Sequence, residues 1–219
     1  MRLKVDSKLK DKCLDICIGS IEANVKVSDS SSELLQLIDS ECKRIENTYE
    51  TKDVSSIKNI NDSRLAYRSI GKDPTRYRLS SEALFRRVSK GDGLYIINNI
   101  VDINNLISLK SAYSVGTYDL DKIVGQINFT VGGEGESYKG IGKGSVNIEN
   151  LPVFEDEEGK FGSTTSDSTR AMINDDSVHI LMNIISFNGD KELNSNMDIA
   201  EKLLLDYAEA EIIDKIIVR

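Results

Sequence analysis

The spacing of apolar residues along the chain predicts helices in its middle and strands on either side. Alternation and β-branched residues predict strands at residues 2–5 and 12–27, the second with the character of a half-buried hairpin. Apolar residues at helical spacing predict helices at 30–50, 54–70, 80–89, 100–112 and 194–215. Further strands are expected at 124–131, 137–141, 145–154 and 177–187. Because no repeat or linker-like stretch interrupts this pattern, we expect one α+β domain over residues 1–219.

Composition narrows the class of protein. Of the 219 residues, 39% are hydrophobic and 29% are charged, which is typical of a chain that buries a core in water. No apolar run approaches the ~20 residues that span a bilayer, so no membrane partner is expected. The first residues, MRLKVDSKLKDK, lack the apolar stretch of a signal peptide, and the three cysteines show no paired spacing. We therefore expect a cytoplasmic protein with structural thiols and neither a metal site nor a cofactor.

Charge is distributed unevenly along this acidic chain. Between Arg64 and Lys90, eight basic residues stand against two acids, a balance of +6 in a chain whose net charge is −8. An acidic protein with one basic band can bind a polyanion locally. The same band is equally compatible with a solvated face on two helices.

Two stretches concentrate uncharged hydrogen-bonding groups. In helix 100–112, Asn104, Ser108 and Ser111 fall on one face beside the apolar stripe. The segment KFGSTTSDSTR, residues 160–170, carries seven hydroxyl or carboxylate side chains in the eight positions after Gly162. Each stretch has an ordinary alternative, because asparagines tie down neighbouring backbone and Ser/Thr-rich loops form flexible surface turns.

Common catalytic motifs are missing. YKGIGKGS lacks the Lys-Ser/Thr pair of a phosphate-binding loop, because Gly144 follows Lys143, and GxGxxG spacing is absent. The single histidine, His179, stands within the apolar run VHILMNII, where a core or surface strand residue is expected. One histidine rules out a multi-histidine metal site and disfavours a Ser-His-Asp triad.

A longer motif carries a resemblance. NNIVDINNLISLKSAYSVGTYDLDKIVG, residues 98–125, resembles a segment of the B-three/B-four domain of the phenylalanyl-tRNA synthetase beta subunit, the module that hydrolyses wrongly charged tRNA. The matching positions are Asn99, Val101, Asp102, Asn105, Tyr118, Asp119, Asp121, Lys122 and Gly125. The segments YRSIGKDPTRYRLSSEALFRRVSKGDGL and FGSTTSDSTR resemble freestanding proteins built from this domain. The resemblance covers residues 65–187, and we expect residues 1–64 and 188–219 to be packed extensions.

The resemblance implies a fold and a site. The fold would be an α+β layered domain with a β-sandwich of unusual topology. The partner would be mischarged aminoacyl-tRNA, whose ester is activated enough that orientation and oxyanion stabilisation suffice for hydrolysis without a histidine base. The implied catalytic residues are Asn104, Ser166 and Asp167, and the implied substrate-binding residues are Asn105, Ser108, Gly116, Tyr118, Asp119, Ser163 and Thr164. The phosphate contacts would be Arg76, Arg78, Arg86 and Arg87.

Departures from the family pattern leave alternatives open. Gly116 stands where the synthetase has a histidine, so the synthetase's choice of substrate does not carry over, and nothing resembles its catalytic core. The chain is therefore not expected to charge tRNA. Three functions remain: an esterase that edits mischarged tRNA in trans, a non-catalytic module that binds tRNA or RNA, and an amino-acid-binding protein. The amino acid, the tRNA and the oligomeric state stay open.

Overall fold

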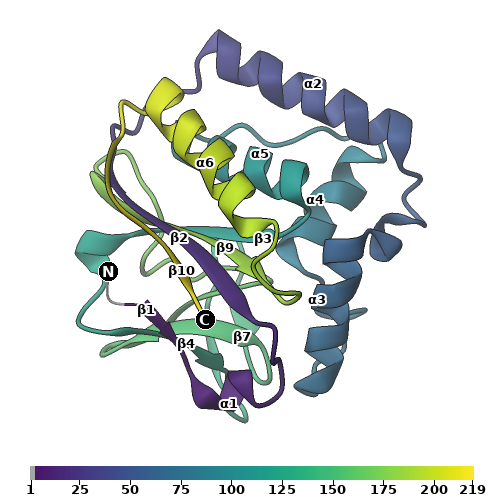
Figure 1. Ribbon diagram of the computed structural model, residues 1–219, viewed down its shortest axis with the longest axis vertical. Coiled ribbons are helices and arrows are strands. Elements are labelled where there is room, and N and C mark those ends of the chain that lie inside the picture. Colours follow the sequence, from purple (N-terminus) through teal and green to yellow (C-terminus); the bar gives the residue numbers. More distant parts are fainter. Residues whose placement is uncertain (1–2) are drawn as a thin grey trace.

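The computed structural model describes residues 3–219, and two four-stranded sheets form its frame (Figure 1). The central sheet has the order β10-β2-β9-β3, with antiparallel neighbours throughout: β2 (Cys17–Asn24), β3 (Ser114–Asp119), β9 (His179–Ser186) and β10 (Glu211–Val218). The outer sheet has the order β1-β4-β7-β8: β1 (Leu3–Val5), β4 (Ile127–Val131), β7 (Pro152–Asp156) and β8 (Gly159–Ser163). Among the strands of residues 3–219, only β1 and β4 pair in parallel. A separate ribbon joins β5 (Ser137–Lys139) and β6 (Ser145–Asn147).

Helices cover the central sheet on the side away from the outer sheet. Figure 1 shows α5 and α6 over that face, with α2 beyond them at the edge of the molecule. The α-helices are α1 (Ser7–Lys10), α2 (Ser32–Thr48), α3 (Lys58–Ser69), α4 (Ser80–Val88), α5 (Asn99–Ser111) and α6 (Leu193–Tyr207), and two 3-10 turns are η1 (Val54–Ser56) and η2 (Leu120–Lys122). No helix within residues 3–219 is long and apolar enough to cross a membrane.

Alternation along the strands divides the buried side chains between two cores. On β2, Ile21 and Ala23 join the core beneath the helices, whereas Ile18 joins the core between the sheets. The inter-sheet core also holds Phe129 and Phe154. A strand buried on both faces needs apolar side chains on each, which explains the apolar character of β2 and β9. The layers of helices, central sheet and outer sheet confirm the α+β sandwich that the resemblance implied.

The helix that carries the first candidate residues forms where its pattern predicts. Ile100, Ile103 and Leu106 are fully buried on one face of α5. Asn98 caps the helix by accepting a hydrogen bond from the N–H of Val101, and Ala112 ends it in a left-handed conformation with φ of 59°. Asp102 ties the helix start to two loops, because its carboxylate accepts from the Ser30 hydroxyl and the Ile97 amide.

The predicted elements near the chain ends are partly wrong. No hairpin forms over 12–27: β1 and β2 belong to different sheets, and residue 2 of the first expected strand lies outside the described residues. The last helix ends at Tyr207 rather than 215. The chain then turns into β10 at Ala208 and Glu209, and the φ of Glu209 is 48°. β10 then supplies β2 with its second neighbour.

Two strands, β3 and β8, are absent from the strands expected from the sequence. β3 follows α5 directly, and β8 contains the first part of the Ser/Thr-rich stretch. The strand expected at 145–154 is two strands, β6 and β7, separated by a turn at Asn150 with φ of 55°. The helix expected at 54–70 is interrupted at Ile57, between η1 and α3. The additional strands matter here because β3 and β8 carry much of the candidate site.

Candidate functional site

The candidate site lies along the free edge of β3. β9 pairs with one side of β3, and the loop after β8 runs along the other side. The Ser114 hydroxyl donates to the Thr164 carbonyl at 3.3 Å, and the Asp119 amide donates to the Ala171 carbonyl at 3.0 Å. Because amides of an edge strand point alternately toward and away from the partner strand, those of Val115 and Thr117 face the loop as well.

Asp167 is a half-buried loop residue whose carboxylate bonds to both β3 and the end of β8. Its Oδ1 accepts from the Tyr118 hydroxyl at 2.9 Å and from the Ser163 amide at 2.9 Å. Its Oδ2 has no hydrogen-bond partner within residues 3–219. Burial raises the pKa of the Asp167 carboxyl to about 6, against the two hydrogen bonds, which favour the ionised form. A carboxyl that titrates near neutrality and keeps one oxygen free has the properties of a general base.

Two glycines make room for the ring of Tyr118. A Cβ on Gly116 would lie 2.5 Å from the Tyr118 hydroxyl oxygen, and a Cβ on Gly162 would lie 2.2 Å from it. The ring packs edge-on against Phe154 and Phe161, with centroids 5.4 and 5.0 Å away. Burial raises the pKa of Tyr118 well above its ordinary value, so the hydroxyl stays protonated and donates to Asp167.

The hydroxyl groups of the loop are ordered by hydrogen bonds rather than exposed on a flexible turn. The Ser163 hydroxyl donates to the Ser166 carbonyl at 2.8 Å and accepts from the Ser166 amide at 3.0 Å. The Tyr67 hydroxyl bonds to the hydroxyls of Thr164 and Thr165, at 2.5 and 2.8 Å. The structure therefore brings Ser163, Thr164, Ser166, Asp167, Gly116 and Tyr118 into one cluster.

Asn104 and Asn105 belong to a different face of β3. The Asn104 Oδ1 accepts from the Thr117 hydroxyl at 2.9 Å, and its Nδ2 donates to the Asn105 Oδ1 at 3.4 Å. Thr117 and Tyr118 are successive strand residues, so their side chains point to opposite faces of the sheet. Asn104 thus lies on the helix side of β3, and Asp167 is bound on the side that faces the outer sheet.

Two of the predicted substrate-binding residues, Asp119 and Ser108, lie in surroundings that indicate a role in the fold. Asp119 is buried, accepts from the Ser177 hydroxyl at 2.7 Å and forms an ion pair with Lys122 at 2.8 Å. Ser108 is buried on α5, and its hydroxyl has no hydrogen-bond partner within the described chain. Neither side chain contacts the cluster around Asp167 through a hydrogen bond.

Comparison with known proteins matches a family model over residues 62–204, and its description is B3/4 domain. The chain belongs to the B3/4 domain family. A similar solved structure is an N-terminal fragment of the phenylalanyl-tRNA synthetase beta subunit from Pyrococcus horikoshii, with a TM-score of 0.51 and 13% identity over 99% of this chain. This chain spans 54% of that fragment, and the likeness shows a shared fold. A search of curated proteins gave no match.

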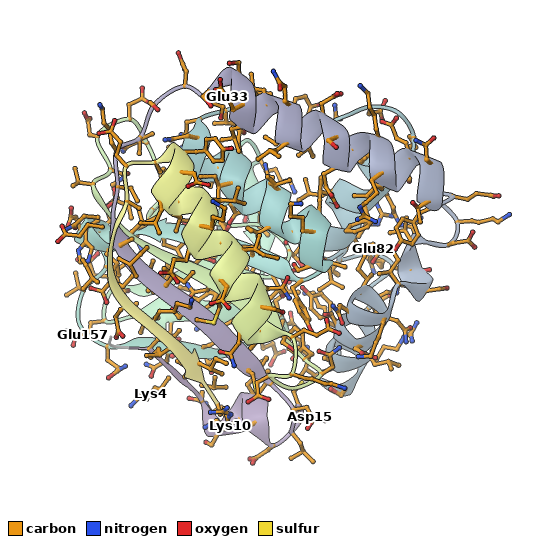
Figure 2. All side chains as sticks on the ribbon, turned by 45° about the horizontal axis from the view of Figure 1, so that its top comes forward. Lys4, Lys10, Asp15, Glu33, Glu82 and Glu157 are labelled. Atoms are coloured by element: carbon orange, nitrogen blue, oxygen red, sulfur yellow. The ribbon has the colours of Figure 1, made fainter. Side chains whose placement is uncertain are left out.

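Several side chains of the basic band, Arg64 to Lys90, form contacts within this B3/4 domain. Glu82 is fully buried and forms ion pairs with Arg64 and Arg86, both at 2.8 to 2.9 Å. Figure 2 shows Glu82 within the protein beneath α2, whereas Glu33 lies at the periphery. Arg87 stacks over the ring of Tyr95. Arg76 and Arg78 are exposed, as phosphate contacts require, although the Arg78 guanidinium also lies 3.9 Å from the Glu82 carboxylate.

Several residues of the B3/4 domain's cluster were missed from the sequence. Tyr67 and Tyr138 both reach the loop, Tyr138 by donating its hydroxyl to the Ser166 carbonyl. Asn183 pairs with Gly116 across the central sheet, is fully buried, and has an Nδ2 without a partner within residues 3–219. A polar residue in the apolar run VHILMNII was the one available signal for Asn183. No group of three or more His, Cys, Asp or Glu side chains among residues 3–219 is placed to hold a metal ion.

Proposed function

We propose that this chain hydrolyses the ester of mischarged aminoacyl-tRNA in trans, in the cytoplasm. One observation carries the proposal: Asp167 combines a pKa near 6, a fixed Oδ1 and a free Oδ2 at the edge of a strand with outward-facing amides. Membership of the B3/4 domain family and the fold shared with a phenylalanyl-tRNA synthetase fragment support tRNA as the partner.

The proposed reaction uses Asp167 as the base. A water at Oδ2 attacks the ester carbonyl carbon and passes a proton to the carboxylate. The carbonyl oxygen becomes an oxyanion, which the Val115 and Thr117 amides at the β3 edge stabilise. The intermediate collapses by breaking the bond to the ribose oxygen, which takes the proton back from Asp167. Free amino acid and uncharged tRNA leave.

Other residues would act on the substrate rather than on the reacting atoms. Asn104 and Asn105 offer amide groups on the helix side of β3, where the substrate's ammonium and ribose hydroxyls can bind. Tyr118, Gly116, Ser163 and Ser166 position Asp167 and its loop. Arg76 and Arg78 would contact phosphates. We also propose that residues 1–219 act as one domain, because β2 and β10 complete the central sheet that holds β3.

A second candidate is an amino-acid-binding protein that does not use RNA. The internal use of the basic band favours it: Arg64 and Arg86 neutralise Glu82, and Lys72 is buried against the Glu149 carbonyl. Fewer free cations remain for phosphates than the sequence indicates.

Purified protein incubated with a panel of correctly and wrongly charged tRNAs distinguishes the candidates. Release of labelled amino acid from at least one mischarged tRNA supports the esterase. Tight tRNA binding without release supports a non-catalytic module. Binding of a free amino acid, with neither release nor tRNA affinity, supports the second candidate.

A further inference from the structure

A cavity of about 300 Å³ lies at one end of the layer between the two sheets. Its walls come from β2, β9, η2 and the segment that leads into β4: Glu22, Leu120, Asp121, Ile123, Gly125, Ile127, His179 and Leu181. Its volume is at the lower end of the range for small-molecule sites. The cavity contains none of the residues assigned above to the editing reaction.

The interior of the cavity is aliphatic. Leu120, Ile123, Ile127 and Leu181 belong to the inter-sheet core or pack against it. Leu181 of the cavity wall pairs with Tyr118 across the central sheet. These two neighbouring side chains lie between the cavity and the Asp167 cluster. A branched alkyl group would find contacts of ordinary core type on these walls.

The polar groups of the cavity carry negative charge. His179 Nε2 lies 3.0 Å from Glu22 Oε1, and its Nδ1 lies 3.8 Å from Asp121 Oδ1, so the imidazole bridges two carboxylates. A third carboxylate, Glu157, packs against Gly125 of the wall and lies at the periphery in Figure 2. The lining includes neither lysine nor arginine.

We propose that this cavity is a second binding site, for a small aliphatic ammonium compound. The alkyl body would occupy the aliphatic interior, and the ammonium would replace or share the contact of His179 with Glu22 and Asp121. An ammonium donates three hydrogen bonds and accepts none, which matches a wall of carboxylate acceptors. A ligand with a free carboxylate would be repelled by the same groups.

The single histidine makes the site directly observable. In untagged protein, the imidazole signals of His179 in a proton–nitrogen spectrum report on this cavity alone. The probe is 3-methylbutylamine, and the matched comparisons are 3-methylbutanol, which keeps the alkyl body without charge, and 3-methylbutanoate, which reverses the charge. We expect saturable shifts of the His179 signals with the amine only, in the millimolar range or below.

Variants distinguish recognition of the ammonium charge from nonspecific filling of the cavity. Glu22→Gln keeps the shape of the side chain and should weaken amine binding about tenfold, because a charge-assisted hydrogen bond is lost. The control Glu46→Gln, an exposed carboxylate of α2, should leave binding unchanged. Equal binding of the alcohol, tighter binding of the carboxylate, or unaltered affinity in Glu22→Gln would each overturn the proposal, as would unmoved His179 signals. Deacylation of tRNA is measured separately, so either proposal can fail alone.

Discussion

The Tyr118 hydroxyl donates a hydrogen bond to Asp167 Oδ1 across 2.9 Å, and this contact joins an edge strand of the central sheet to the loop after β8. The tyrosine ring fits only because Gly116 and Gly162 lack side chains beside it. The contact leaves Oδ2 free, so the base that the proposed reaction needs is oriented before substrate arrives.

Stability should depend on pH through Asp167. Its folded-state pKa, about 6, lies above the ordinary value of 3.8, so the fold favours the protonated acid. The resulting stabilisation is present below about pH 4 and is lost as pH rises through about 6. Asp167→Asn mimics the protonated acid at every pH. Between acid and neutral pH, the free energy of unfolding of the variant should therefore rise by about 3 kcal/mol relative to that of the wild type, as measured by denaturant unfolding. An unchanged difference between the two proteins would show that Asp167 is not buried as described.

Gly116→Ala should displace Tyr118. The new Cβ would lie 2.5 Å from the tyrosine hydroxyl oxygen, so the ring must move and the bond to Asp167 must lengthen or break. We expect a loss of about 1–3 kcal/mol in the free energy of unfolding, as in other overpacked cores, together with reduced deacylation. Gly144→Ala is the matched control, because a Cβ there meets nothing within 4 Å and its φ is not positive. Equal stability of the two variants would contradict the packing described for Tyr118.

Two exposed arginines should bind tRNA, and of the two only Arg78, 3.9 Å from Glu82, has an ion pair within residues 3–219. The double variant Arg76→Ala, Arg78→Ala should weaken tRNA binding and reduce the slope of log affinity against log salt by about 1 to 2. A double variant at Lys43 and Lys202, on α2 and α6, removes the same charge elsewhere and should have a smaller effect. If tRNA affinity and its salt slope are the same in both, the basic band does not contact RNA.

Glu82 should matter for stability rather than for binding. Glu82→Gln leaves Arg64 and Arg86 without their shared carboxylate in a largely buried setting, which should cost about 3 kcal/mol in the free energy of unfolding. Glu134→Gln, at an exposed position, should be neutral within about 0.5 kcal/mol. Thermal or denaturant unfolding of the two variants tests this directly. A neutral Glu82→Gln would mean that the arginines find water or other partners without strain.

The sequence predicts helices and strands well where the apolar residues follow a single helical or strand spacing. α5 is an example, because Ile100, Ile103 and Leu106 form a stripe that a helix must bury. The pattern extends the last helix to residue 215, into the first part of β10, because EIIDKIIV places apolar residues in adjacent pairs that suit a helix or a strand. The choice between helix and strand depends on the unpaired edge of β2, which becomes available only in the tertiary fold.

The sequence predicts the two stretches that form the candidate site, but it does not predict how they pack against each other. The resemblance drew attention to residues 104–119 and 163–167, and the structure brings part of each together. Tyr118 and Asp167 are 49 positions apart, and no spacing rule predicts their contact. The separation of Asn104 from Asp167 follows from β3 being a strand, since a strand sends Thr117 and Tyr118 to opposite faces.

Single-turnover deacylation of mischarged tRNA by the wild type and by Asp167→Asn tests the central claim most directly. With Asp175→Asn, an exposed carboxylate, as control, the wild type and the control should release amino acid equally, with a rate that rises as pH passes through about 6. Asp167→Asn should be slower by about 10²–10⁴-fold, the range for loss of a general base, and should lose that pH dependence. Wild-type-like release by folded Asp167→Asn, with the pH profile intact, would contradict the account.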